Sequence, residues 1–132
     1  MLAYLLDTDI CIHALKRRNQ SLAAQFEAND GRMAISDVTL FELAYGAEKY
    51  AEPQQRLAII ESFAARLELL PFESRAAFHA AEIRASLERA GQMIGGYDLM
   101  IAGIARSRGL VLVTGNLREF ERVQGLRVES WG

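Results

Sequence analysis

Short apolar runs alternate along this chain with longer segments whose apolar residues recur every three or four positions. The short runs are typical of strands buried on both faces, and the longer spacing is typical of helices. Strands are therefore predicted at residues 1–6, 33–35, 67–70, 110–114 and 126–129. Helices are predicted at residues 10–16, 20–29, 38–50, 54–66, 73–90, 97–108 and 118–123.

The order of these elements predicts the fold class. Strands that alternate with helices form parallel sheets, because right-handed helical crossovers connect one strand to the next. We therefore expect an α/β fold, a three-layer α/β/α sandwich with a central parallel sheet. The 97–108 segment is so apolar that both faces of its helix must be covered, which makes it a central helix. With no internal repeat or linker, residues 1–132 are predicted to form a single domain.

Composition narrows the possible chemistry. Cys11 is the only cysteine and there are two histidines, so a Cys/His zinc site has too few ligands and any metal must be held by oxygen. The longest apolar run, near 99–105, is too short to span a bilayer and no signal-like segment precedes it, so we expect a cytoplasmic protein without a membrane partner. The net charge of −2 neither supports nor excludes an RNA substrate.

Three acidic residues stand at positions where ligands commonly bind. Asp7 follows the first predicted strand and Asp98 begins the helix at 97–108; capping of a helix is the alternative role for each. Loops after the carboxyl ends of parallel strands gather at one edge of a sheet. Glu42 lies among apolar neighbours on its helix, with no lysine or arginine at i±3 or i±4. It must meet a cation, be protonated, or emerge at an edge of the packed face.

Convergence of Asp7, Glu42 and Asp98 around a divalent cation would offset their mutual repulsion, since Mg²⁺ prefers oxygen ligands. Such an ion polarises a phosphoryl oxygen and lowers the pKa of a bound water, which is the chemistry of phosphodiester hydrolysis. Asn116 follows the strand at 110–114, together with Thr114, at the same edge. Its amide is suited to orient a metal-bound water or the scissile phosphate, and a simple loop cap is an equal alternative.

Four arginines are predicted in segments that flank this edge of the sheet. They would neutralise RNA phosphates there, or be ordinary solvated surface residues. They are Arg106, Arg108, Arg118 and Arg122. Trp131, near the end of the chain, is expected to pack against the domain.

Four segments, in this order, resemble the motifs of PIN-domain ribonucleases, and specifically of VapC-type toxins of type II toxin–antitoxin pairs. They are Y-L-L-D-T-D-I-C-I, S-D-V-T-L-F-E-L-A-Y-G, I-G-G-Y-D-L-M-I-A and L-V-T-G-N-L-R-E-F. The resemblance covers essentially the whole chain. It implies that Asp7, Glu42 and Asp98 hold Mg²⁺ or Mn²⁺, with Asp7 and Asp98 as the most direct ligands. Many PIN domains carry a further acid where this chain has Asn116, which puts a second metal in doubt.

The resemblance also implies partners and a substrate class. It implies an endoribonuclease toxin that forms a homodimer and is inhibited by a cognate VapB-type antitoxin, whose C-terminal segment crosses the acidic site. Its relatives cleave structured RNAs, commonly in tRNA anticodon loops. The expected substrate is therefore RNA, specifically tRNA, and the most specific expectation is initiator tRNA.

Two alternative functions remain open at the level of the sequence. Asp7-Thr8-Asp9 resembles the turn of haloacid-dehalogenase-type aspartyl phosphatases, but such sites need a downstream lysine and this chain has only Lys16 and Lys49. The other alternative is a PIN-like domain that binds RNA or a partner without cutting, as happens when the acids are lost. Here Asp7, Glu42 and Asp98 are all present.

Overall fold

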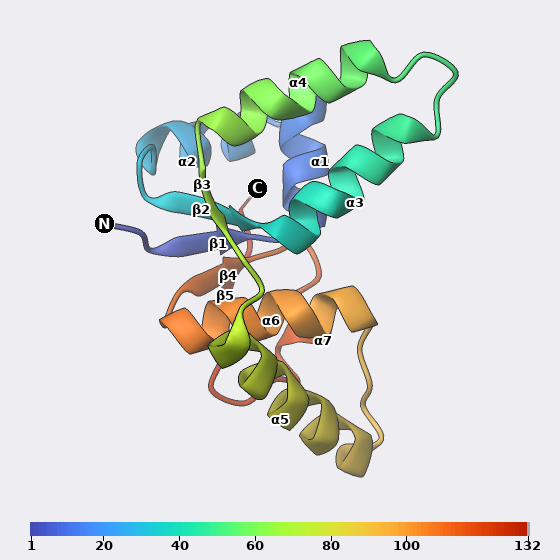
Figure 1. Cartoon of the computed structure of the whole chain (residues 1–132). Coiled ribbons are helices and arrows are strands. Elements are labelled where there is room, and N and C mark those ends of the chain that lie inside the picture. Colours follow the sequence, from blue (N-terminus) through green and yellow to red (C-terminus); the bar gives the residue numbers. More distant parts are fainter. Residues whose placement is uncertain (132) are drawn as a thin grey trace.

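The computed structural model describes residues 1–131, which form a five-stranded sheet between two layers of helices (Figure 1). The strands are β1 (Tyr4–Leu6), β2 (Met33–Ser36), β3 (Glu68–Leu70), β4 (Val111–Val113) and β5 (Val128–Glu129). The helices are α1 (Thr8–Lys16), α2 (Gln20–Ala28), α3 (Asp37–Glu48), α4 (Gln54–Ala65), α5 (Ser74–Ala90), α6 (Gly96–Arg108) and α7 (Leu117–Phe120). Every predicted element is present, and the predicted α/β sandwich is confirmed.

The sheet is parallel throughout and has the strand order β3-β2-β1-β4-β5. The strands β2 and β3 therefore lie on one side of β1, and β4 and β5 lie on the other side. Connections leave β1 and β4 in opposite directions, which opens a crevice at the carboxyl ends of these two strands. Asp7 follows β1 and Thr114 follows β4, so both residues stand at this crevice.

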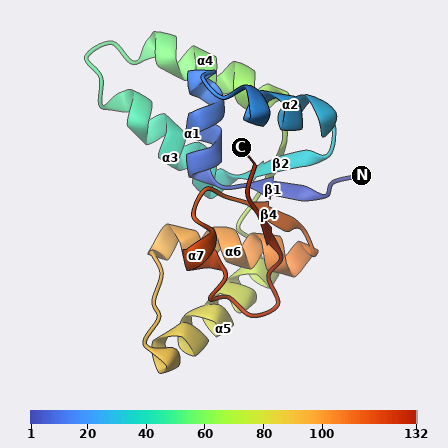
Figure 2. The ribbon, with the colours of Figure 1, turned by 180° about the vertical axis from the view of Figure 1, so that it is seen from behind.

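Helices α1 to α4 cover one face of the sheet, and α5 to α7 cover the other (Figures 1 and 2). Alternate strand residues point to opposite faces. Leu5 and Leu112 belong to the core beneath α5 and α6, whereas Leu6 and Val113 belong to the core beneath α1 to α4. This burial on both faces explains why the strands are continuously apolar. Trp131 is buried against the second core, as expected.

Helix α6 lies between the sheet and α5, and a glycine sets how closely the two helices approach. A Cβ at Gly103 would stand 2.6 Å from the backbone oxygen of Ala76 and 2.9 Å from the Cβ of Ala80. Neither atom can move without separating the helices. The close approach of α5 to α6 therefore depends on the absence of a side chain at this position.

Gly103→Ala is expected to lower the free energy of unfolding by about 1–3 kcal/mol, the usual cost of overpacking. Gly46→Ala is the matched control, because Gly46 is also helical and a Cβ there meets nothing within 4 Å. That control is expected to raise the stability by roughly 0.5–1 kcal/mol. Urea denaturation of both variants measures the difference, and equal stabilities would contradict the packing argument.

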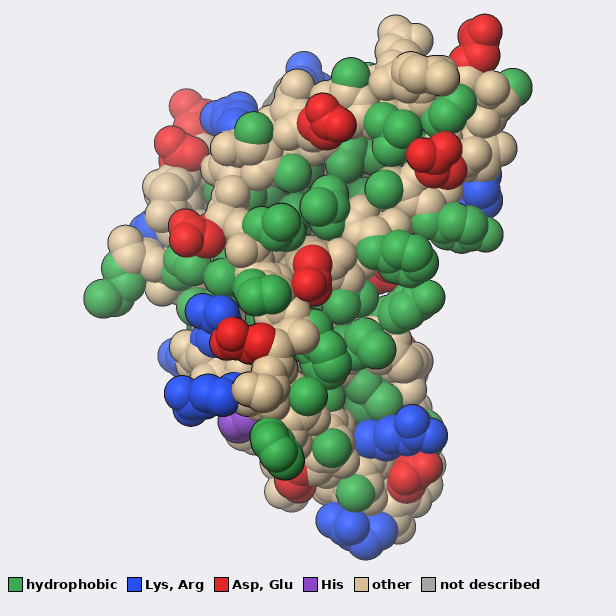
Figure 3. Space-filling model, viewed as in Figure 1, with side chains coloured by type: hydrophobic (Ala, Val, Ile, Leu, Met, Phe, Trp, Pro, Cys, Tyr) green, Lys and Arg blue, Asp and Glu red, His purple; other side chains and the backbone are tan. Residues whose placement is uncertain are grey.

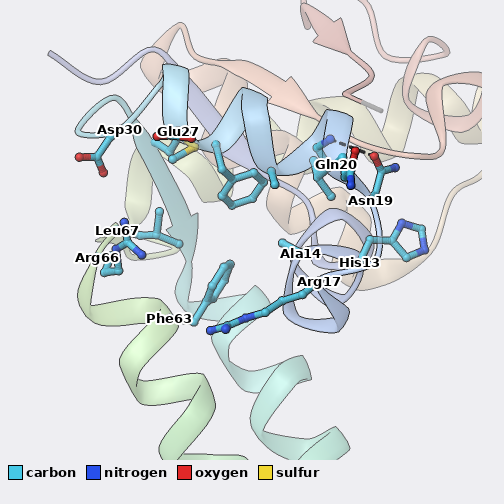
Figure 4. A pocket seen from close by; sticks show the side chains of 14 residues that line it. His13, Ala14, Arg17, Asn19, Gln20, Glu27, Asp30, Phe63, Arg66 and Leu67 are labelled. Atoms are coloured by element: carbon cyan, nitrogen blue, oxygen red, sulfur yellow. Dashed lines mark hydrogen bonds between the residues drawn. The ribbon is translucent and has the colours of Figure 1, made fainter.

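None of the helices within residues 1–131 is both long and apolar enough to cross a bilayer. A cavity of about 750 Å³ opens between α1, α2 and α4, with His13, Arg17, Phe26 and Phe63 among its lining residues (Figure 4). None of the acids expected at the catalytic centre lines this cavity. The predicted chemistry must therefore be sought at the carboxyl end of the sheet.

Candidate active site

Asp7 is the most firmly held of the predicted site residues. Its Oδ1 accepts a hydrogen bond from the Thr8 backbone N–H at 2.8 Å, and its Oδ2 accepts one from the Thr114 hydroxyl at 2.8 Å. Its own N–H donates to the Val113 carbonyl at 2.8 Å, so the residue is fixed between β1 and β4. The side chain is 5% exposed. Burial, followed by the charge of Asp9, raises the pKa of Asp7 to about 7.

Glu42 reaches the same crevice from α3. That helix is oriented by a buried cap, in which the Ser36 Oγ accepts from the Thr39 N–H at 2.9 Å. The Thr8 hydroxyl donates to the Glu42 Oε1 at 2.7 Å and lies 3.0 Å from the Thr39 hydroxyl. Glu42 is partly exposed. The sequence allowed Glu42 to meet a cation, to be protonated or to emerge at an edge of the packed face. The structure shows the third arrangement, in which the Thr8 hydroxyl donates to the carboxylate.

Asp98 connects the acids electrostatically. It stands in the first turn of α6, after the loop that contains Gly95. Several effects raise its pKa to about 8: burial first, then a hydrogen bond shared with Glu119, then the charges of Asp7, Glu119 and Glu42. Asp98 is therefore close enough to the other two predicted acids for their charges to act on it. The structure brings Asp7, Glu42 and Asp98 to one place.

Glu119 is a fourth carboxylate in this cluster, and the sequence reasoning missed it. It accepts a hydrogen bond from the Asn116 side-chain amide at 2.7 Å. The hydrogen bond with Asp98, assisted by those from Asn116 and the Gly95 backbone, lowers the pKa of Glu119 below its usual value. The predicted site residue Asn116 is thus placed beside the acids, with its amide engaged by Glu119. An acid three residues after a residue that can cap the start of a predicted helix is a known pairing, and this spacing could have pointed to Asn116 and Glu119.

Asp9 is a second acid that the sequence reasoning did not assign. Its carboxylate oxygens accept from the Gly115 N–H at 3.3 and 3.2 Å, so Asp9 holds the loop that follows β4. A Cβ at Gly115 would stand 2.8 Å from the Asp9 Oδ2, which explains the glycine. The same loop carries Thr114, whose hydroxyl donates to Asp7 and accepts from the Asn116 N–H at 3.0 Å. Asp9 therefore supports the environment of Asp7 through the loop.

The expectation that Arg106 and Arg108 border the acidic edge is wrong. Both lie in the last turn of α6, at the end opposite Asp98. Arg106 donates to the His79 Nδ1 at 2.9 Å, and Arg108 forms an ion pair with Glu73 at 3.3 Å. A helix of 13 residues is about 20 Å long, so its two ends stand at opposite edges of the sheet.

Arg122 does lie near the acids, but it has a different role from the one predicted. Its Nη1 donates to the carbonyls of Gln92 at 3.4 Å and Met93 at 3.1 Å. Its charge also helps to lower the pKa of Glu119. Arg122 therefore ties the C-terminal segment to the loop that leads into Asp98.

No group of three or more acid, histidine or cysteine side chains within residues 1–131 is arranged as a ready-made metal site. Hydrogen bonds to Thr8, Thr114 and Glu119 orient the carboxylates instead. No ion pair in the described part of the chain includes Asp7 or Asp98, and burial together with the repulsion of neighbouring acids raises the pKa of both carboxyl groups. A hard cation relieves the same repulsion and takes the same oxygen atoms. The donor set therefore fits an oxygen-ligated metal ion.

The sequence model of the PIN domain matches residues 4–126, which is nearly the whole chain. This chain belongs to the PIN-domain family. The resemblance expected from its four motifs is confirmed. PIN-domain ribonucleases of the VapC type are metal-dependent hydrolases that act on RNA, in agreement with the all-oxygen donor set.

Several relatives of this PIN domain are similar over their full length. The chain is 53% identical over 131 residues to the tRNA(fMet)-specific endonuclease VapC of Shigella flexneri, with 99% of each chain covered. It is 51% identical over 131 residues to the protein of the same name in Salmonella typhimurium strain LT2, again with 99% of each covered. Among solved structures, a chain of the DNA-bound VapBC complex from Salmonella typhimurium superposes with a TM-score of 0.96, 51% identity and full coverage of both chains.

Proposed function

We propose that this PIN domain is a metal-dependent endoribonuclease toxin that hydrolyses tRNA, with initiator tRNA as its substrate. The observation that carries the proposal is the meeting of Asp7, Glu42 and Asp98 at the crevice between β1 and β4, with Glu119 beside them. Full-length similarity to VapC proteins named for their action on tRNA(fMet) supports the substrate. Cytoplasmic tRNA is the pool on which such an enzyme acts, so we place the protein there.

Asp7, Asp98 and Glu42 are the residues that we assign to hold Mg²⁺, with Mn²⁺ as a substitute. When bound, the cation supplies polarisation of the phosphate and activation of a water. The chain itself supplies rigidity: the Thr8 N–H and the Thr114 hydroxyl fix Asp7. Holding the ligands before the reaction avoids the cost of arranging them during it.

Three further side chains complete the proposed site. The Thr8 hydroxyl keeps Glu42 at the edge of α3, directed toward α1. Glu119 supplies a carboxylate in the fourth motif, where Asn116 is neutral, and Asn116 orients it. Because Asp98 and Glu119 share a hydrogen bond, we expect Glu119 to hold the Asp98 side chain in place at the site.

The test is cleavage of purified tRNA by the purified, antitoxin-free protein, read as fragments on a denaturing gel. Discrete fragments are expected with Mg²⁺ and none with EDTA, and Asp98→Asn is expected to remove them. Sequencing of the fragment ends identifies the cleaved tRNA. Intact tRNA with Mg²⁺, combined with retained RNA binding, would instead favour a domain that binds without cutting.

The environment of Asp7 offers a test of the metal assignment. Thr114→Val removes the hydroxyl that donates to Asp7 with little change in shape, and Thr114→Ser retains it. Loss of a group that orients a metal ligand typically lowers metal affinity 10–100-fold. We expect this loss for Val and near-wild-type affinity for Ser, measured by Mn²⁺ titration calorimetry. Equal affinities in the two variants would show that Thr114 does not support the metal site.

The proposal includes an antitoxin partner, because the structural relatives include VapBC complexes. A groove of about 340 Å³ between α1, α3 and α4 has Glu42 among its lining residues, together with the apolar residues Ile12, Leu15 and Ile59. We place the C-terminal segment of the antitoxin in this groove, from which it reaches the acids. The toxin homodimer expected from the resemblance stays part of the proposal.

Ile59→Glu is expected to abolish co-purification with the co-expressed antitoxin, because it places a charge in the apolar groove. Cleavage of tRNA by the isolated variant should persist, since Ile59 belongs to α4 and lies outside the acidic cluster. A pull-down and a cleavage assay on the same preparation measure both. Undiminished co-purification would show that the antitoxin binds a different surface of the protein.

A further inference from the structure

Three exposed aromatic residues lie on the two helices that carry Glu42 and Asp98. Phe41 precedes Glu42 on α3, Tyr97 precedes Asp98 on α6, and Tyr45 lies one turn after Phe41. The residues are 52%, 47% and 58% exposed, respectively. We call these three side chains the aromatic rim. Such large apolar rings are usually buried, so their exposure at one place calls for an occupant.

The rings form one continuous surface across the junction of α3 and α6. Phe41 and Tyr97 meet edge to face, with ring centroids 5.6 Å apart and planes at 70°. Phe41 and Tyr45 are nearly parallel, at 17°, with centroids 6.5 Å apart. Figure 3 shows hydrophobic side chains gathered on both sides of this junction. The two helices that present the rim are therefore the two that present Glu42 and Asp98.

Charge also bears on what the rim contacts. The Lys49 Nζ stands 5.1 Å from the centre of the Tyr45 ring, which places a cation at one end of the rim. The chain as a whole has a net charge of −2, and Arg106 and Arg108 are engaged at the far end of α6. Attraction of phosphates alone is consequently weak. A nucleic acid bound here needs a contact that does not depend on charge, and base stacking on aromatic rings is such a contact.

We propose that the aromatic rim stacks unpaired bases of the RNA next to the scissile phosphate, with Lys49 facing the adjoining phosphate. This inference rests on the proposed function and deepens it, by assigning the residues that hold unpaired nucleotides of the substrate at the cut. Bases inside an RNA duplex are already stacked on each other, and the deep major groove keeps side chains from their edges. Nucleotides in a loop can turn outward and lay a face on a ring.

A second copy of the chain is the competing occupant of an apolar surface. The position of the rim favours RNA, because the rings directly flank two of the acids. During cleavage the molecule that must lie beside these acids is the substrate. Stacking is also tolerant of base identity, which suits a surface made of rings.

The binding test uses the full chain with Asp98→Asn to prevent cleavage, and a tRNA anticodon stem–loop with 2-aminopurine at each unpaired position in turn. Stacking quenches 2-aminopurine fluorescence. We expect quenching at one or two loop positions, its loss in Phe41→Ala and Tyr45→Ala, and its return in Phe41→Trp. The dissociation constant should rise about 5- to 100-fold in the alanine variants. Phe78→Ala is the matched control, since Phe78 is a 79% exposed ring on α5.

In the active protein, Tyr45→Ala should raise KM about 10-fold or more with kcat nearly unchanged, because the lost contact holds substrate and transition state alike. Unchanged quenching and KM in both alanine variants would overturn the inference. A lower molecular mass of the alanine variants in light scattering, with 2-aminopurine quenching unchanged, would also overturn it. The rim would then be covered by a second copy of the chain. If wild-type protein cleaves no tRNA, the proposed function itself fails. If it cleaves and the alanine variants cleave equally well, this inference alone fails.

Discussion

Asp7→Asn should abolish metal-dependent tRNA cleavage and yet yield a more stable protein. Asparagine has the same shape, and its amide oxygen can still accept from the Thr8 N–H. It lacks the negative charge that holds a divalent cation, an effect worth several kcal/mol in catalysis. At about 1.4 kcal/mol per factor of ten, we expect a loss of roughly 1,000-fold or more in cleavage rate. A gel assay of tRNA cleavage measures it directly.

The gain in stability has a separate physical cause. The pKa of Asp7 is raised to about 7 from 3.8, so at neutral pH its ionised form opposes folding. Removing that charge should raise the free energy of unfolding, measured in EDTA, by an amount on the order of a few kcal/mol. Asp30→Asn is the control, because Asp30 is an exposed acid outside the cluster. A cleavage-deficient Asp7→Asn protein that is also less stable would be misfolded, and its inactivity would not report on the metal.

The combination of lost activity and gained stability distinguishes a functional acid from a structural one. A carboxylate kept only as a helix cap would leave the stability nearly unchanged on substitution by asparagine, which caps helices about as well as aspartate. Asp7 does accept the N–H of Thr8 at the start of α1, so it has both roles. The measurement decides which of them dominates. With burial and a neighbouring like charge raising its pKa, we expect the electrostatic cost to exceed the benefit of the cap.

The fold could be predicted because its signals are local. Strands buried on both faces must be apolar throughout, and the helices between them have their own spacing, so element order alone implied a parallel sheet. The meeting of Asp7 and Asp98 followed from the rule that ligands bind at the carboxyl edge of such a sheet. The rule needed only the positions of these residues after a strand and at the start of a helix.

The site residues that could not be predicted from the sequence depend on tertiary contacts. Glu119 contacts Asp98 because the short helix α7 lies beside the first turn of α6. A helix of four residues is too short for a periodic pattern that would predict this contact. Asp9 holds Gly115 across 106 residues of sequence. The error over Arg106 and Arg108 was avoidable, since the length of their helix separates them from Asp98.

Stability should fall as the pH rises from about 4 to about 8 when EDTA is present. The folded-state pKa values of Asp7 and Asp98 are raised to about 7 and about 8 from 3.8. Between these limits the folded chain binds more protons than the unfolded chain, so the stabilisation present below pH 4 is lost as the pH passes through the raised values. Each proton of difference lowers the free energy of unfolding by about 1.4 kcal/mol per pH unit.

Mg²⁺ should reverse this dependence. The cation binds the ionised carboxylates of the folded state, so its stabilising effect grows as protons leave. Urea denaturation at pH 5 and pH 8, with EDTA or Mg²⁺, gives the four values needed, and Asp7→Asn and Asp98→Asn should each flatten the EDTA curve. If the stability of the wild-type protein in EDTA rose with pH, the pKa values of Asp7 and Asp98 would not be raised in the folded state. The expected fall would mean that the fold bears a cost for assembling the acids, and that a metal ion removes that cost.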